Sequence, residues 1–318
     1  MSEPGNLLVS TAIVLGAATG VGLHVALQLV GKGWRVLAVD IKKAELLAAQ
    51  DEAKKATAAA VKGVKKGSLE VCVTNLATKE GCARVLETYH ALRGSPSGAW
   101  AAGPPLDALI NCVAIFHFSP IACVRDGMMD HTFAVNALAP MRLASCLMPE
   151  LLEGGGGTIV NFSSLGVNVR SLGGPIAKPW AGAYSSTKFA LAGFSEALRQ
   201  EAYEAGLPLR VIDFVHPGAV DTPRARRQVQ VLGEWLEKNQ QSPWLQGVQD
   251  AKRQWNKVLK TAAPPERVAA SIVRAATHNN SWPRPRNLAE WLLLVGYLFR
   301  SCLSACIGDW RLFRSGYL

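Results

Sequence analysis

Two side chains of this sequence are spaced so that together they could exchange a proton with an alcohol near neutral pH. Tyr184 and Lys188 lie four residues apart, so on a helix they share one face. A phenol has a reference pKa of about 10, and service as a base near pH 7 needs about 3–4 kcal/mol of preference for the phenolate. A neighbouring ammonium group supplies part of that preference. The pair predicts proton exchange with a substrate oxygen.

A glycine cluster near the start of the chain predicts a binding turn for a dinucleotide. Gly16, Gly20 and Gly22 stand between an apolar run and a helix-like stretch. Glycines let backbone N–H groups approach a pyrophosphate at a helix N-terminus. Asp40 follows 18 residues after Gly22, close to the offset of about 20 residues at which an acid reaches the adenosine ribose. This favours NAD, because Asp40 repels a 2′-phosphate; NADP, bound with help from the lysines at 42–43, is the less favoured alternative.

The elements that would hold these residues alternate between apolar runs and helix-like stretches. The runs lie at residues 8–15, 35–39, 69–73, 106–111, 158–162 and 209–215. Continuous apolar runs suit strands covered on both faces, and alternating units imply right-handed crossovers. We therefore predict an α/β fold, a Rossmann-type doubly wound parallel sheet with helices on both faces and a C-terminal helical extension.

We expect one domain over residues 1–318, with its core at 7–222 and a substrate-capping and C-terminal extension at 223–318. A loop at 93–105 is expected to be a surface insertion. A second loop, at 166–182, is also rich in turn residues. The two loops are expected from their composition, and the C-terminal extension is expected from the loss of the strand rhythm after residue 217.

Composition narrows the functional class. The chain has 318 residues, 49% of them hydrophobic and 18% charged, with a net charge of +10. The charge suits acidic partners such as nucleotides, but no interleaving of aromatic and basic residues indicates a nucleic-acid surface. Seven scattered cysteines without CxxC pairs predict a reduced, cytoplasmic chain without a metal site. The first basic residue is Lys32, so we expect no secretory leader.

The sequence resembles the short-chain dehydrogenase/reductase family over residues 7–222. The motifs that carry the resemblance are the glycine turn, an asparagine in a helix, the second serine after a strand, YxxxK and PG-x-x-x-T, found here as Gly16, Gly20, Gly22, Asn136, Ser164, Tyr184, Lys188, Pro217, Gly218 and Thr222. The resemblance implies that Tyr184 exchanges the proton, that Ser164 binds the same substrate oxygen, and that Lys188 holds the nicotinamide ribose. It also implies that Asn136 positions a water relay.

The resemblance further implies a set of cofactor-binding residues: Gly16, Thr19, Gly20, Val21, Gly22, Asp40, Asn75, Leu76, Asn111, Tyr184, Lys188, Pro217, Gly218, Val220 and Thr222. Two positions depart from the family pattern. Asn75 stands where the family has an aspartate beside the adenine. The family's NNAG appears as the run 111–114, in which Cys112 and Val113 bring bulkier side chains.

A finer resemblance, at 179–184, 194–201 and 283–286, is to the branch of retinol, 17β-hydroxysteroid and 3-hydroxybutyrate dehydrogenases. It implies a hydrophobic alcohol or ketone as substrate, and the family implies a homo-oligomer. Aromatic residues at 116, 118, 235, 244 and 255 would suit such a substrate, but equally could close an ordinary core. A non-catalytic dinucleotide-binding or scaffold protein is the alternative function.

Two later segments allow more than one interpretation. The arginines 224, 226 and 227 could attract an acidic substrate or the cofactor phosphates, but we favour a solvated helix start. The apolar run at 288–307 is interrupted by charges, so it is too short to span a bilayer. It either packs on the fold or makes a peripheral membrane contact, and the protein is expected to be cytoplasmic and possibly membrane-associated.

Overall fold

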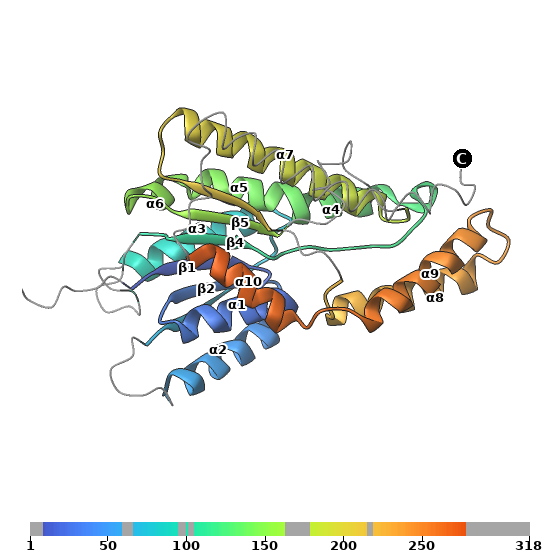
Figure 1. Ribbon diagram of the computed structural model, residues 1–318, viewed down its shortest axis with the longest axis horizontal. Coiled ribbons are helices and arrows are strands. Elements are labelled where there is room, and N and C mark those ends of the chain that lie inside the picture. Colours follow the sequence, from blue (N-terminus) through green and yellow to red (C-terminus); the bar gives the residue numbers. More distant parts are fainter. Residues whose placement is uncertain are drawn as a thin grey trace, which may run out of the picture.

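The computed structural model describes residues 9–58, 66–94, 100, 105–162, 179–214 and 219–277. Within them, six strands form one sheet in the order β3-β2-β1-β4-β5-β6, and every pairing is parallel (Figure 1). The strands are β1 (Thr11–Leu15), β2 (Arg35–Asp40), β3 (Ser68–Val73), β4 (Ala108–Asn111), β5 (Thr158–Phe162) and β6 (Arg210–Phe214). This order is that of a doubly wound dinucleotide-binding sheet, so the predicted fold class is confirmed.

Helices cover both faces of the sheet (Figure 1). One face carries α1 (Gly20–Gly31), α2 (Lys43–Ala58) and α10 (Pro265–Thr277); the other carries α3 (Lys79–Gly94), α4 (Asp126–Phe133), α5 (Ala139–Cys146), α6 (Met148–Glu153) and α7 (Gly182–Glu204). Alternate residues of β1 enter two cores: Ala12 and Val14 face α1 and α10, while Ile13 and Leu15 face α3 and α5. Because both faces are covered, the strands are mainly apolar.

The segment at 93–105 is not wholly a surface insertion. Trp100 is only 1% exposed, and its indole packs edge-on against Tyr89 at 6.2 Å between ring centroids. Its Nε1 donates to Ser68 Oγ at 3.3 Å. The expectation was wrong at this residue, because a tryptophan gains more from burial in the core than its loop-like neighbours suggest.

Two further helices form a hairpin at one end of the molecule, away from the sheet (Figure 1). They are α8 (Pro223–Lys238) and α9 (Leu245–Lys260). Leu232 of α8 and Val248 of α9 pack with Phe118 and Ala181. The tail at 288–307 lies outside the described residues, so neither interpretation of it is tested. None of the helices in the described ranges is long and apolar enough to cross a membrane.

Candidate active site

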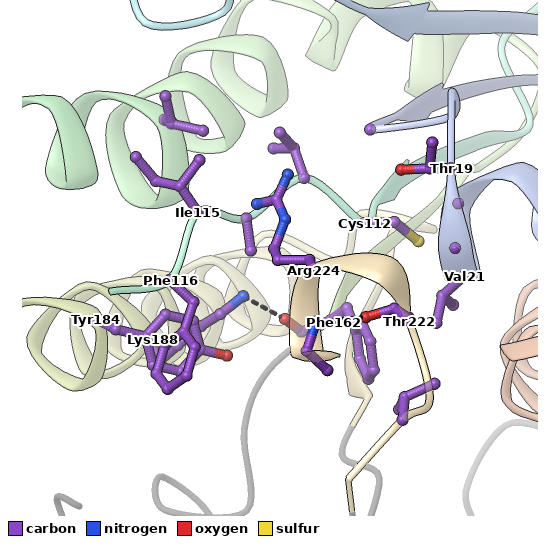
Figure 2. Close-up of a pocket in the computed structure, with 18 of the residues that line it drawn as sticks. Thr19, Val21, Cys112, Ile115, Phe116, Phe162, Tyr184, Lys188, Thr222 and Arg224 are labelled. Carbon is purple, nitrogen blue, oxygen red and sulfur yellow. Dashed lines mark hydrogen bonds between the residues drawn. The ribbon is translucent and has the colours of Figure 1, made fainter. Parts of the chain in front are cut away.

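A cavity of about 670 Å³ lies at the carboxyl ends of the strands, where a doubly wound sheet binds ligands. It is lined by the glycine turn, the end of β2, the chain after β4, one face of α7 and the start of α8 (Figure 2). The predicted site residues that line it are Gly16, Thr19, Gly20, Val21, Gly22, Asp40, Asn75, Leu76, Tyr184, Lys188, Val220 and Thr222. The structure thus brings together residues spread over two hundred positions of the chain.

The glycine turn has no room for side chains. A Cβ on Gly22 would lie 2.1 Å from the carbonyl oxygen of Gly16, and a Cβ on Gly16 would lie 2.7 Å from Cα of Val113. Gly16 also has φ +77°, a conformation that favours glycine. The turn leads directly into the first turn of α1. This backbone cradle at a helix N-terminus fits the pyrophosphate of a dinucleotide.

Asp40 is held at the rim of the cavity by the backbone. Its carboxylate accepts from the N–H groups of Ala18 at 3.1 Å, Ile41 at 2.8 Å and Lys42 at 3.2 Å. The Lys42 side chain turns to Glu45, 3.5 Å away. A carboxylate that accepts three N–H groups is fixed in position and retains acceptor capacity for a hydroxyl.

Lys188 lies beside Tyr184 on α7. Its Nζ donates to the carbonyl oxygen of Phe162 at 2.7 Å (Figure 2) and lies 5.7 Å from the centroid of the Tyr184 ring. The side chain is buried, and this desolvation lowers the pKa of Lys188 to about 8. Arg224 acts in the same direction, while Cys112 opposes it. An ammonium group therefore lies close to the phenol face, as the spacing predicts.

Asn136 occupies a π-helical turn, Ala134–Leu138, between α4 and α5. Its Oδ1 accepts from the N–H of Ile115 at 2.7 Å, and its Nδ2 donates to the carbonyl oxygen of Ile115 at 2.8 Å and to Oγ1 of Thr187 at 3.2 Å. Thr187 in turn donates to the carbonyl oxygen of Tyr184 at 2.7 Å. Asn136 is thus tied to the turn of α7 that carries Tyr184. The sequence analysis missed Thr187. Only its position three residues after Tyr184 could have indicated a hydrogen bond back to that turn of the helix.

Asn111, expected at the cofactor, does not line the cavity. It is 1% exposed, and its Nδ2 donates to Oδ1 of Asn161 at 3.5 Å. Asn161 donates onward to Oγ of Ser195 at 2.8 Å. The next residue, Cys112, lines the cavity instead, and desolvation raises the pKa of its thiol to about 12. Asn111 therefore lies beneath the floor of the site.

Thr222 is the N-cap of α8, where its Oγ1 accepts from the N–H of Ala225 at 3.1 Å. The residues before it are fixed by a parallel bridge between Val220 and Ala263. The hydroxyl proton of Thr222 is left to donate into the cavity. Three other predicted residues, Ser164, Pro217 and Gly218, lie outside the described residues.

Aromatic rings gather over the catalytic candidate. The ring of Phe116 meets that of Tyr184 edge-on, with centroids 4.5 Å apart. Phe118 lies 4.6 Å from Phe116 and 5.3 Å from Trp255. Trp255, from α9, is held by a hydrogen bond from its Nε1 to the carbonyl oxygen of Ala225 at 3.1 Å. These residues form an apolar wall, defined here as Phe116, Phe118 and Trp255.

The three arginines at the start of α8 do not share one environment. Arg226 pairs with Asp221 at 2.6 Å, and Arg227 pairs with Glu234 at 2.6 Å. Arg224 instead lines the cavity. All three side chains are exposed, as a solvated helix start implies, but Arg224 alone also borders the cavity (Figure 2).

Comparisons with known proteins agree with this fold. A family model described as short chain dehydrogenase matches residues 10–231. The uncharacterized oxidoreductase YbbO of Escherichia coli K12 is 26% identical over 218 residues, which cover 69% of this chain and 68% of that protein. The 2-keto-3-deoxy-L-fuconate dehydrogenase of Xanthomonas campestris is 25% identical over 221 residues, 70% of this chain and 62% of that protein.

A solved structure shows the same fold. The L-sorbose reductase of Gluconobacter frateurii, complexed with NADPH and L-sorbose, superposes with a TM-score of 0.62 at 21% identity and covers 85% of this chain and 90% of that chain. The names of these relatives refer to sugars or to no substrate. They give no support to the expected retinol, 17β-hydroxysteroid and 3-hydroxybutyrate branch.

Proposed function

Because the chain belongs to the short-chain dehydrogenase family, we propose that it is an oxidoreductase that interconverts an alcohol and a ketone with a nicotinamide dinucleotide. The observation that carries the proposal is one cavity that contains the glycine turn, Asp40, Tyr184 and Lys188. The dinucleotide supplies or accepts the hydride when bound. The chain's own residues bind it, orient the substrate and exchange the proton.

Each catalytic candidate has a distinct task in this proposal. Tyr184 exchanges the proton with the substrate oxygen, and Ser164 hydrogen-bonds that same oxygen. Lys188 binds the nicotinamide ribose, and its ammonium group favours the phenolate of Tyr184. Asn136 is a positioning residue, since its amide is occupied by Ile115 and Thr187. It aligns the turn that carries Tyr184 and borders a water relay.

The test of catalysis is Tyr184→Phe, with Tyr203→Phe as its matched control. Tyr203 lies on the same helix and is 68% exposed. Loss of a general acid–base group costs about 10²–10⁴-fold in rate. We expect Tyr184→Phe to lose that much of kcat/KM while it still binds NADH, and Tyr203→Phe to retain activity. A Tyr184→Phe protein with its biological activity intact would instead support the non-catalytic scaffold function.

We propose NAD rather than NADP as the preferred cofactor. Asp40 keeps acceptor capacity for ribose hydroxyls, and its charge repels a 2′-phosphate. The opposing point is that the L-sorbose reductase was solved with NADPH. Titration with NADH and NADPH, followed by nicotinamide fluorescence, should show tighter binding of NADH. Asp40→Ala should weaken NADH binding about tenfold, whereas Asp51→Ala, exposed on α2, should not. Tighter binding of NADPH by the unaltered protein would contradict the preference.

We propose that the alcohol or ketone is hydrophobic, because Phe116 packs against the ring of Tyr184 and lines the cavity together with Trp255. The sugar names of two relatives favour a polyol as the second candidate. A panel of long-chain and aryl secondary alcohols against sorbitol and gluconate separates the two. Phe116→Ala should lower kcat/KM for the apolar alcohols by about 10-fold or more. Turnover of polyols alone would overturn this substrate class.

Two further properties are proposed from the sequence. A homo-oligomer is expected from the family, and light scattering on the purified protein measures it. A peripheral membrane contact through 288–307 is the second, and cosedimentation of the full chain with anionic phospholipid vesicles measures that. A monomer in light scattering would contradict the homo-oligomer. A chain that stays in the supernatant would contradict the membrane contact.

A further inference from the structure

The first turn of α8 places a cation inside the cleft. Arg224 is two residues beyond Thr222, the N-cap of α8. A Cβ on Gly20 would lie 3.1 Å from Cγ2 of Thr222, so this turn of α8 lies against the glycine turn. In Figure 2, the guanidinium group of Arg224 lies in the cavity between Tyr184 and Lys188 on one side and Thr19 on the other.

Arg224 lacks the ion pair that its neighbours have. Among the described residues it has no hydrogen bond or ion pair, whereas Arg226 and Arg227 each bind a carboxylate. Desolvation lowers the pKa of Arg224, and the fields of Asp40 and Tyr184 act in the opposite direction. Arg224 is exposed at the edge of the cavity, and a guanidinium group without a carboxylate partner has its donors available for an anion. Arg224 therefore presents an available cation to a ligand in the cavity.

The position of Arg224 selects among the possible anions. A 2′-phosphate would lie at the end of β2, beside Asp40. A carboxylate on the substrate would lie beyond Tyr184, where the apolar wall stands. Arg224 lies between the Tyr184–Lys188 side of the cavity and Thr19 of the glycine turn (Figure 2), so it lies between the reacting end and the adenosine end. The group that joins the two halves of a dinucleotide is its diphosphate.

Resting on the proposed dinucleotide function, we propose that Arg224 binds the diphosphate bridge and thereby fastens α8 across the bound cofactor. A guanidinium group binds phosphate oxygens through two parallel N–H donors. The carbonyl oxygen of the next residue, Ala225, accepts a hydrogen bond from Trp255, so the same turn of α8 also holds part of the apolar wall. Cofactor binding and the formation of the substrate mouth are coupled through α8.

The experiment compares Arg224→Gln with Arg227→Gln, an exposed arginine nearly one turn further along the same helix. Calorimetric titrations use NADH, NADPH, ADP-ribose and adenosine. We expect Arg224→Gln to weaken the three diphosphates about 10–100-fold and by similar factors. Adenosine, which has no phosphate, should bind as before, and Arg227→Gln should bind all four normally. Arg224→Lys, which keeps the charge but not the two-pronged geometry, should fall between.

Other outcomes overturn the assignment. A loss confined to NADPH would place Arg224 at the 2′-phosphate. Unchanged dinucleotide affinities with a raised KM for an acidic substrate would place it at the substrate. If the unaltered protein binds ADP-ribose and Arg224→Gln binds it equally well, the clamp fails while the proposed function survives. If the unaltered protein binds no dinucleotide, the proposed function itself fails. Thermal unfolding of each variant shows whether it is folded. If Arg224→Gln is misfolded, the affinities of Arg224→Lys for the same four ligands test the proposal instead.

Discussion

Lys188 is 2% exposed, and burial lowers the pKa of its amine from the usual 10.5 to about 8. Between these two values the unfolded chain holds a proton that the folded chain has lost, so stability rises with pH across this window. Below about pH 8 the folded protein must keep a charged amine buried. The difference corresponds to about 3 kcal/mol. Lys188 therefore lowers stability at neutral pH, where its charge serves Tyr184.

We predict that Lys188→Met stabilises the ligand-free protein at pH 7 and abolishes activity. The gain should be about 1–2 kcal/mol, because relief of desolvation is offset by loss of the hydrogen bond to Phe162. Urea unfolding at pH 7 and pH 9.5 should show a smaller gain at the higher pH. Lys55→Met, exposed on α2, should show no such difference between the two pH values. A loss of stability at pH 7 would contradict the argument.

For single residues, the sequence predicted which residue types form the site, but it did not predict where every side chain lies. Tyr184 and Lys188 share a face because helical spacing alone decides it. Asn111 and Arg224 were placed differently by the structure, since neither position follows from local spacing. Asn111 is drawn under the floor by Asn161. Arg224 reaches the edge of the cavity because α8 begins against Gly20, a contact between segments two hundred residues apart.

The turn from β1 into α1 is the element on which the cofactor proposal rests. Gly22→Ala would put a Cβ 2.1 Å from the backbone oxygen of Gly16, so the turn itself must distort. We predict a loss of about 1–3 kcal/mol in stability and at least a 10-fold loss in NADH affinity. Gly31→Ala, at the other end of the same helix, meets nothing within 4 Å and should be neutral or stabilising by up to about 1 kcal/mol.

Thermal unfolding and NADH titration of these two variants provide the measurement. The comparison separates a general effect of alanine in α1 from the effect of filling the cradle. Equal NADH affinities for Gly22→Ala and Gly31→Ala would show that the turn does not bind the dinucleotide. The cofactor site would then have to lie elsewhere in the cavity.

The strands were the most predictable elements. Residues 158–162 were predicted and found without change, and the other strands differ by at most a few residues at their ends. A strand that is buried on both faces has a nearly continuous run of apolar residues, and such a run can be recognised in the sequence. The π-helical turn at Asn136 has no such signature, because it depends on the hydrogen bonds of Asn136 to Ile115 and Thr187. The burial of Trp100 was missed for a similar reason, because it depends on contacts with Tyr89 and Ser68, which are distant in the sequence from its loop-like neighbours.

Within the described residues, the hydrophobic clusters differ in size. Two large clusters fill the two faces of the sheet, and β1 contributes to both. The cluster that holds the α8–α9 hairpin has four buried members, Phe118, Ala181, Leu232 and Val248, with aromatic rings around them. Local opening follows the amount of buried apolar contact. The hairpin should therefore open at a lower free energy than the sheet, which suits an element that must admit a cofactor and then cover it.

Hydrogen exchange should measure this difference in opening free energy between the hairpin and the sheet. We predict that backbone amides of α8 and α9 exchange at least about 10-fold faster than those of β1 in the ligand-free protein. NADH should slow exchange in α8, because the diphosphate bound by Arg224 links the hairpin to the glycine turn. α10, which packs along α1 (Figure 1), should respond much less and serves as the internal control. In Arg224→Gln, saturating NADH should leave α8 nearly as fast as before. If α8 exchanges in step with β1 without ligand, or slows equally in both proteins, the hairpin is a fixed part of the fold rather than a cover fastened by the cofactor.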